Sequence, residues 1–204
     1  MSKNIEHIFY INLDKRKDRK SQLEQEMKNV GWNAERYSGI YSYPPRGIVG
    51  CTKSHLNVLK LAHERLYKNV LILEDDFQFI ESKEVVEEKL HQLFSFRPDF
   101  DVCFLSYNLK EGKIEQEFPF LTRVLHSSTA SAYIVKNHYY DKLINLYEEA
   151  IPKLESTMEH WNYANDQVWK CLQKKDKWYG FTKRLGKQRD GYSDNADKIV
   201  QYDC

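Results

Sequence analysis

The sequence predicts an α/β fold in which a Rossmann-like, mostly parallel mixed sheet is flanked by helices. Residues 70–73 form an uninterrupted aliphatic run, which is typical of a strand buried on both faces of a parallel sheet. Segments with apolar residues at helical spacing alternate with other strand-like segments. With 204 residues and 41% hydrophobic content, the chain is long enough for a sizeable core, so we expect a single domain over residues 1–204.

The chain is expected to open with a strand, a helix and a second strand. Residues 7–13 are rich in β-branched and aromatic side chains, which favour a strand. Residues 17–29 are polar with apolar residues at i, i+4 spacing, which predicts an amphipathic helix. A short strand is expected within residues 32–40, and the prolines of residues 41–47 predict a loop.

A second helix is expected to open at Gly50 and to lead into the central strand. Its buried side would consist of four apolar residues at roughly helical spacing: Leu56, Leu59, Ala62 and Leu66.

The second half of the chain is predicted from the same two periodicities. Helices are expected at residues 82–94, at 137–150 and from 165, and strands at 101–106, 123–128 (an edge strand) and 129–135. Residues 108–119 are polar and predict an excursion from the sheet. Residues 188–204 are expected to form a polar tail, either frayed or ordered as a lid over the site.

Composition excludes several classes of protein. A net charge of +1 gives no reason to expect a nucleic-acid-binding or membrane-binding surface. The four cysteines have no paired metal-site spacing, and their scatter favours a reducing compartment. We expect a cytoplasmic chain without a membrane span or signal peptide, lumenal only if it is fused to or carried by a partner.

Three carboxylates, Glu74, Asp75 and Asp76, follow the buried strand directly. The carboxyl end of such a strand is where open α/β sheets bind ligands. Adjacent carboxylates repel each other and are costly to bury unless a cation lies among them, and hard oxygen ligands suit Mg²⁺ or Mn²⁺. A metal held in this way usually carries a substrate phosphate. A solvated acidic loop explains the same residues equally well.

Basic residues follow the first strand. Arg16 or Arg19 could bind a phosphate or stack on a base, and a strand, loop and helix of this kind suit the entry to a nucleotide site. On these residues alone, a solvated basic turn is the more ordinary interpretation.

The expected helix start at Gly50 is a second candidate for phosphate or sugar binding. Free backbone N–H groups and the hydroxyls of Thr52 and Ser54 would suit such a ligand, although N-capping by either hydroxyl explains the same pattern. His55 could contact a ligand or be a hydrogen-bonded structural histidine. Further along, Asp166 suits an N-cap or first turn, and this position would also orient a catalytic base.

Five of these motifs occur in an order that points to one family of proteins. They are, in order, residues 11–13 with Arg16 and Arg19, Gly50–Cys51 with Ser54–His55, residues 71–76, residues 130–135 and residues 190–194. In this order they resemble glycosyltransferase family 25, which includes bacterial lipopolysaccharide galactosyltransferases and the galactosyltransferase domains of procollagen-modifying enzymes. The resemblance covers nearly the whole chain.

The resemblance implies a GT-A-like fold and inverting transfer of a hexose, galactose or glucose, from a UDP-sugar. The acceptor would be a hydroxyl on a glycan, a lipopolysaccharide or a protein. Asp76 would hold Mn²⁺ or Mg²⁺, with Glu74 and Asp194 as further contacts to the metal. Glu74 and Asp75 would face the ribose or donor sugar, and the segment from Asn12 to Arg19 would receive the nucleoside.

The resemblance also implies a catalytic base and a closing tail. Asp166 is the candidate base, with Glu159 as the alternative. Arg189 and Ser193 would bind phosphate when the tail, residues 188–194, closes over the donor. Two other functions fit less well. A metal-dependent nucleotidyltransferase would be expected to carry a Gly-rich phosphate loop, and a non-catalytic glycan-binding or nucleotide-sugar-binding module has no need of the carboxylates.

Overall fold

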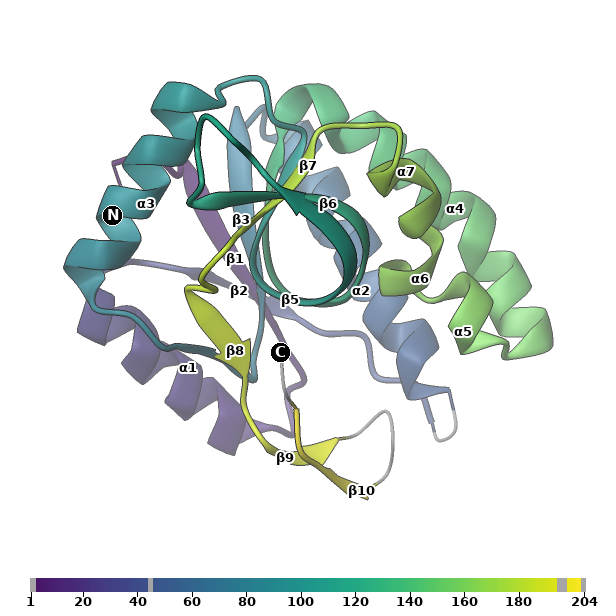
Figure 1. Ribbon diagram of the computed structural model, residues 1–204. Helices are drawn as coiled ribbons and strands as arrows, with labels where there is room; N and C mark the ends of the chain where they lie inside the picture. The colour runs from purple at the N-terminus through teal and green to yellow at the C-terminus, as the bar shows by residue number, and fades with distance from the viewer. Residues whose placement is uncertain (1–2, 44–45, 194–197, 203–204) are drawn as a thin grey trace.

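In a computed structural model, which describes residues 3–43, 46–193 and 198–202, the chain folds around a six-stranded mixed sheet (Figure 1). Its strands are β1 (His7–Asn12), β2 (Glu35–Ser38), β3 (Asn69–Glu74), β5 (Val102–Ile114), β6 (Leu121–Lys136) and β7 (Trp178–Phe181). Their order across the sheet is β2-β1-β3-β6-β5-β7, and β6 alone of the six runs antiparallel to its neighbours. The predicted mostly parallel mixed sheet is confirmed.

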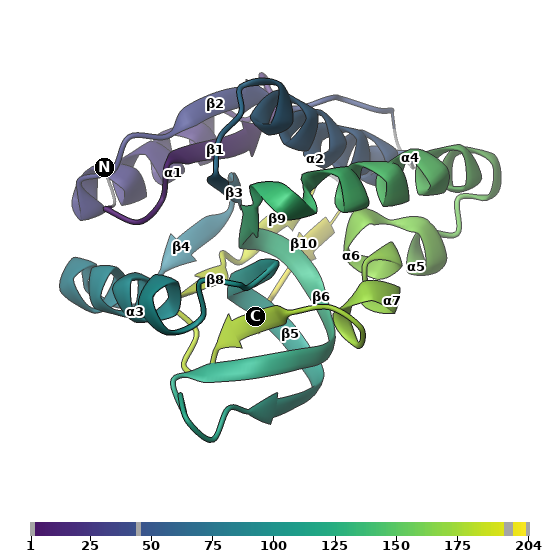
Figure 2. The same cartoon turned by 90° about the horizontal axis from the view of Figure 1, so that it is seen from above.

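Helices cover both faces of the sheet. They are α1 (Lys17–Val30), α2 (Gly47–Glu64), α3 (Lys83–Phe96), α4 (Tyr140–Thr157), α5 (His160–Tyr163), α6 (Asn165–Val168) and α7 (Lys170–Gln173), with a 3-10 turn η1 (Asn137–Tyr139) before α4. Figure 2 shows α1 and α3 on one side and α2 and α4 on the other. Within the described residues, no helix is both long enough and apolar enough to cross a lipid bilayer.

The central strand β3 explains the two-sided packing. Val70 and Ile72 pack into the core beneath α2 and α4, whereas Leu71 and Leu73 pack into the core beneath α1 and α3. Alternate residues of a strand point to opposite faces of the sheet. Because helices cover both faces, all four side chains are fully buried. The interpretation of residues 70–73 as a strand buried on both faces is therefore confirmed.

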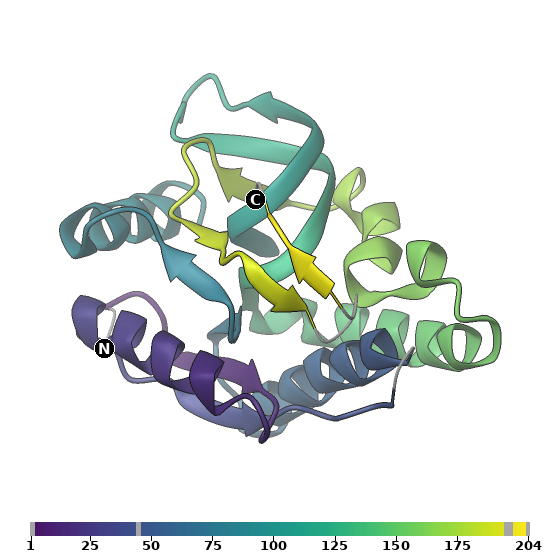
Figure 3. The same ribbon diagram turned by 90° about the horizontal axis from the view of Figure 1, so that it is seen from below.

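The topology brings distant segments to the carboxyl ends of β1 and β3. These two strands are parallel neighbours, and Ile11 pairs with Glu74, so the acidic turn lies beside the end of β1. After the turn, β4 (Phe77–Phe79) pairs with β8 (Gly186–Gln188), which draws the C-terminal segment to the same edge. The ribbon of β9 (Gly191–Ser193) and β10 (Lys198–Val200) then crosses this end of the sheet (Figure 3).

The prediction that residues 108–119 leave the sheet as a polar excursion was wrong for most of this segment. Strand β5 continues through most of it and pairs with β6 as a long, exposed hairpin, because cross-strand hydrogen bonds satisfy the backbone whatever the side chains. The two strands predicted at 123–128 and 129–135 are one strand, β6, which lies between β3 and β5 rather than at an edge. A positive φ of 78° at Thr129 interrupts the regular pattern within it.

Two helix boundaries also differ from the prediction. Helix α2 begins at Gly47 rather than at Gly50 and ends at Glu64. The chain then turns with a positive φ at Leu66, whose side chain is 80% exposed instead of buried. Helix α4 runs on to Thr157, with Pro152 inside it.

Candidate functional site

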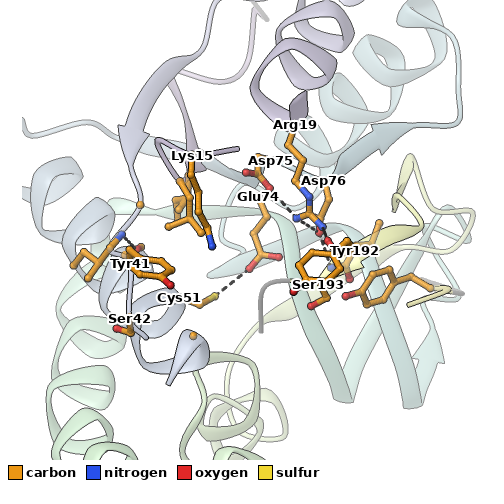
Figure 4. A pocket seen from close by; sticks show the side chains of 18 residues that line it. Lys15, Arg19, Tyr41, Ser42, Cys51, Glu74, Asp75, Asp76, Tyr192 and Ser193 are labelled. Atoms are coloured by element: carbon orange, nitrogen blue, oxygen red, sulfur yellow. Dashed lines mark hydrogen bonds and ion pairs between the residues drawn. The ribbon is translucent and has the colours of Figure 1, made fainter. Parts of the chain in front are cut away.

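A pocket of about 880 Å³, including its open mouth, lies at the carboxyl ends of β1 and β3. Five segments form its wall: the end of β1 with the turn after it, the loop at residues 39–42, the first turns of α2, the acidic turn at 74–76, and the C-terminal segment. Figure 4 shows side chains from these segments converging on the pocket. The position agrees with the general rule that α/β sheets bind ligands beyond the carboxyl ends of their strands.

Two aspartates of the acidic turn pair with the same guanidinium, that of Arg19. Arg19 Nη1 lies 3.0 Å from Asp75 Oδ1 and 2.9 Å from Asp76 Oδ2 (Figure 4). Both aspartates are buried, at 8% and 4% exposure. Burial, and next the charge of Glu74, raise the pKa of Asp76 to about 7 although Arg19 opposes this shift. Two carboxylates thus share one guanidinium, and Asp76 Oδ1 is buried without a hydrogen-bond partner among the described residues.

Asn12 positions Asp75 rather than contacting the pocket. Its amide Nδ2 donates to Asp75 Oδ2 at 2.7 Å, and its Oδ1 accepts from Arg36 Nε at 2.9 Å. Arg36 also donates to the backbone carbonyl of Asn12 at 3.0 Å. Asn12 is 1% exposed and does not line the pocket, so the structure does not support its predicted contact with a nucleoside.

Glu74 turns away from Arg19 and toward α2 (Figure 4). Its Oε1 accepts from Cys51 Sγ at 3.5 Å and lies 3.0 Å from His55 Nε2. Burial acts to raise the pKa of Glu74, but the hydrogen bonds from His55 and Cys51 hold it below its ordinary value, so the carboxylate stays ionised. His55 is fully buried, does not line the pocket, and bonds Tyr133 Oη through Nδ1 at 2.8 Å. Both ring nitrogens of His55 are thus hydrogen-bonded, as the structural alternative expected, and a contact between His55 and a ligand stays a prediction.

Gly50 and Ser54 shape the pocket wall instead of offering free donors. Because α2 begins three residues before Gly50, the Gly50 N–H is bonded to the carbonyl of Arg46 at 3.4 Å. Ser54 Oγ donates to the Gly50 carbonyl at 2.7 Å and accepts from the Ile40 N–H at 2.8 Å. A Cβ at Gly50 would collide with the Ile40 carbonyl, so glycine is needed where the loop approaches α2. The helix start predicted at Gly50 was therefore wrong, whereas phosphate or sugar binding at this wall stays a prediction.

Thr52 does not cap α2 either. Its hydroxyl donates to the carbonyl of Ile48 at 3.0 Å and accepts from the Asn165 N–H at 3.3 Å. Ser54, as described above, also bonds back to the preceding turn. These bonds tie α2 to α6 and to the loop before it, which fixes two walls of the pocket.

The C-terminal segment is docked on the acidic turn. Gln188 Nε2 donates to Asp76 Oδ2 at 3.0 Å, and the Arg189 N–H donates to the Asp76 carbonyl at 2.7 Å. Arg19 Nη2 donates to the Tyr192 carbonyl at 2.8 Å. The described part of the predicted lid therefore lies over the pocket, and its opening and closing stay a prediction.

The other predicted phosphate partners differ in their positions. Ser193 lines the pocket and is 8% exposed. Arg16 does not line it, because its guanidinium pairs with a neighbouring aspartate and donates to the Tyr192 carbonyl. Arg189 is held by Glu26, 2.9 Å from Nη2 to Oε1. Asp194, expected as a metal contact, lies outside the described residues.

The candidate bases lie outside the pocket lining. Asp166, in the first turn of α6, accepts from the N–H of Thr129 through Oδ2 at 3.0 Å. Its charge contributes to the raised pKa of the Cys51 thiol, after burial and Glu74, which indicates that it lies on the α2 side of the site. Glu159 accepts from Asn162 at 2.9 Å within α5. Neither role is tested by these contacts.

Several residues that line the pocket were not chosen as candidates from the sequence. Lys15 Nζ lies 4.4 Å from the centroid of the Tyr41 ring, and both residues line the pocket with Ser42 (Figure 4). Lys15 belongs to the same basic turn as Arg16 and could have been chosen on that ground. Tyr202, which also lines the pocket, carries no local signal because only the folded chain brings it there.

No family model matches the chain. Over 131 residues it is 34% identical to procollagen galactosyltransferase 2 of Mus musculus, covering 52% of this chain and 20% of that protein. Over 102 residues it is 28% identical to a glycosyltransferase 25 family member of Drosophila melanogaster, covering 37% of this chain and 17% of that protein. The chain is similar to glycosyltransferase family 25. The resemblance inferred from its motifs is confirmed, and this family 25-like chain spans about one fifth of the length of these relatives.

A solved structure agrees on the fold. The chain aligns with the crystal structure of mannose-1-phosphate geranyltransferase from Thermus thermophilus with a TM-score of 0.50, covering 91% of this chain and 74% of that one. At 8% sequence identity, this likeness shows the fold alone. With the strand order of the sheet, it supports the GT-A-like fold that the motifs implied.

Proposed function

We propose that this chain is a glycosyltransferase that binds a nucleotide-sugar donor in the pocket and transfers the sugar to an acceptor hydroxyl. The observation that carries the proposal is the pocket itself, in which the acidic turn after β3 faces the end of β1 in a chain similar to family 25. The donor is a UDP-hexose, with galactose or glucose as the sugar. The acceptor is a glycan, a lipopolysaccharide or a hydroxylated protein.

The acidic turn fits a divalent cation. Asp76 Oδ1 is a buried carboxylate oxygen that no described residue hydrogen-bonds, and the charges of Glu74, Asp75 and Asp76 exceed that of Arg19. Asp76 would hold Mn²⁺ or Mg²⁺, because both prefer hard oxygen ligands. When bound, the cation supplies positive charge to the diphosphate as the donor bond breaks.

Arg19 supplies a second, permanent positive charge. Its guanidinium lines the pocket and is held in place by Asp75, Asp76 and the Tyr192 carbonyl. A guanidinium fixed in this way needs little rearrangement to interact with a phosphate oxygen. It therefore stabilises the developing charge of the leaving group better than a mobile side chain would. Arg19 is therefore the protein's own contribution to neutralising the leaving group.

Asp166 is proposed as the base of an inverting transfer. Inversion requires a group on the side opposite the leaving nucleotide that takes the proton of the acceptor hydroxyl. Asp166 belongs to α6, on the α2 side of the site, whereas Arg19 and Asp76 lie on the α1 side. The hydrogen bond from Thr129 N–H holds one carboxylate oxygen and so orients the other.

The docked C-terminal segment is proposed to exclude water. Gln188 and Arg189 attach it to the acidic turn, and Ser193 completes the pocket wall. Water in the site would compete with the acceptor and hydrolyse the donor. We propose that this segment closes fully when donor and metal bind.

The proposal is tested by a screen of several UDP-sugars for UDP release, with Mn²⁺ present and an acceptor alcohol added or omitted. We expect release that depends on one sugar, on acceptor and on metal, and that stops in excess EDTA. An Asp99→Asn variant serves as a control, because Asp99 is exposed and pairs with Lys177 outside the pocket. Pyrophosphate release from UTP and a sugar 1-phosphate, in a parallel reaction without an acceptor alcohol, would point instead to a nucleotidyltransferase. Donor binding without any turnover would point to a binding module.

A further inference from the structure

We propose that Cys51, His55 and Glu74 form a second metal site, for a thiophilic divalent cation such as Zn²⁺. The three side chains come from α2 and from the end of β3, and Cys51 and Glu74 line the pocket. Figure 4 shows the Cys51 thiol and the Glu74 carboxylate pointing toward each other. The site shares only Glu74 with the acidic turn, because Asp75 and Asp76 pair with Arg19 instead.

The three ligand atoms lie close to the spacing that a tetrahedral metal requires. Cys51 Sγ, His55 Nε2 and Glu74 Oε1 all lie within 4.8 Å of one another, with 3.0 Å between Nε2 and Oε1 and 3.5 Å between Sγ and Oε1. Bond lengths of about 2.0–2.3 Å to zinc place the ligands of a tetrahedral site about 3.3–3.8 Å apart. Small side-chain movements would therefore admit the ion.

The surrounding structure holds the ligands ready. Cys51 and His55 are four residues apart on α2, so they share one face of a rigid helix. Tyr133 Oη lies 2.8 Å from His55 Nδ1, and such a partner fixes the ring of a metal-binding histidine with Nε2 toward the ion. The open pocket beside Cys51 and Glu74 gives the ion a way in and leaves room for a water ligand.

The ligand chemistry distinguishes this site from the acidic turn. Sulfur and imidazole ligands select Zn²⁺ or Co²⁺, whereas carboxylates alone suit Mg²⁺ and Mn²⁺. Binding releases the Cys51 thiol proton to solvent. The His55 ring proton that faces Glu74 before the ion binds must move from Nε2 to Nδ1, toward Tyr133 Oη, so that the Nε2 lone pair faces the ion. The thiolate and the Glu74 carboxylate then balance the charge of the cation.

Occupation of this site would block the donor. The bound cation would fix Glu74 against α2 and fill space beside the pocket wall, so donor affinity should fall as zinc rises. This consequence rests on the proposed function, whereas the metal site itself does not. The two can therefore fail separately.

The metal site is tested with Co²⁺ alone, added to the full chain without donor. We expect one Co²⁺ per chain, with the visible absorption of a tetrahedral site and a near-ultraviolet thiolate-to-metal band, displaced by Zn²⁺ but not by Mg²⁺. Cys51→Ser should remove the thiolate band and weaken Co²⁺ binding at least tenfold. Cys171→Ser is the matched control, because Cys171 is an exposed free cysteine in α7, and it should behave as the wild type.

A second variant separates the loss of a metal ligand from a loss of the fold. Glu74→Gln keeps the size of the side chain and should retain the thiolate band while weakening Co²⁺ binding, and unfolding curves of each variant check its fold. Absence of the band in the wild type, or its survival in Cys51→Ser, would overturn the site. Donor affinity that is unchanged by saturating Zn²⁺ would overturn the inhibition only. A chain that binds Co²⁺ as expected but never binds a UDP-sugar would refute the proposed function and leave the metal site standing.

Discussion

Replacing Asp76 by asparagine should stabilise the metal-free protein at neutral and alkaline pH. Asp76 is 4% exposed and lies beside two other carboxylates, Glu74 and Asp75. The asparagine carbonyl can accept from Arg19 and Gln188 where Asp76 Oδ2 now does, and its amide group can occupy the position of Oδ1. The substitution therefore removes a buried charge and keeps the shape of the side chain.

The size of the effect follows from the pKa of Asp76, which burial and the charge of Glu74 raise from 3.8 to about 7. The folded chain holds this proton more tightly than the unfolded chain does. The stability it contributes is fully present below about pH 4 and is lost as the pH rises to about 7. A shift of this size corresponds to about 4 kcal/mol. Because the pKa of about 7 already includes the opposing attraction of Arg19, we expect a net gain of up to about 4 kcal/mol at pH 8.

The measurement is the free energy of unfolding in urea, with EDTA present, for both proteins between pH 4 and pH 8. Titrating groups away from the acidic turn act equally in both proteins, so the informative quantity is the difference between Asp76→Asn and the wild type at each pH. This difference should be small near pH 4 and rise in favour of the variant up to about pH 7. A difference that stays flat, or that falls with pH, would refute the assignment of the raised pKa to Asp76.

Two further predictions concern the proposed mechanism. Asp166→Asn should keep donor affinity but slow transfer by roughly 10²–10⁴-fold, measured by donor titration and product formation; transfer near the wild-type rate would make Glu159 the next candidate. A chain truncated after Lys187 should keep its far-ultraviolet circular dichroism but lose donor affinity and transfer, because it lacks Gln188 and the docked segment. Unchanged donor affinity in that truncation would contradict the lid.

The sequence predicted the parts of the fold that depend on local pattern. A continuous aliphatic run at residues 70–73 has few other solutions than a strand covered on both faces, and it packs in this way. The position of the acidic turn followed from the same argument. Arg19 and Ser193, chosen as ligand contacts, both line the pocket. Their contacts with a donor remain predictions.

The sequence could not show how hydrogen bonds would be distributed between distant segments. Asn12 and His55 stand beside the site, but Arg36 and Tyr133 occupy their polar atoms, and these partners lie far away in the chain. A residue near a ligand site and a residue that supports its wall carry the same local signal. The start of α2 was misplaced because residues 47–49 join the helix, although the prolines before them indicate a loop that continues to Gly47.

The charges of the site explain why donor and metal binding should depend on each other under the proposed function. Asp75 and Asp76 share the single guanidinium of Arg19, and hydrogen bonds from α2 keep the third carboxylate of the turn, Glu74, ionised. A diphosphate is itself an anion, so its approach to this turn is opposed until a cation or a proton offsets the excess charge. A proton on Asp76 offsets part of it below about pH 7, but it also occupies the carboxylate that would hold the metal. A divalent cation offsets more of the excess and attracts the diphosphate, so each ligand favours the binding of the other.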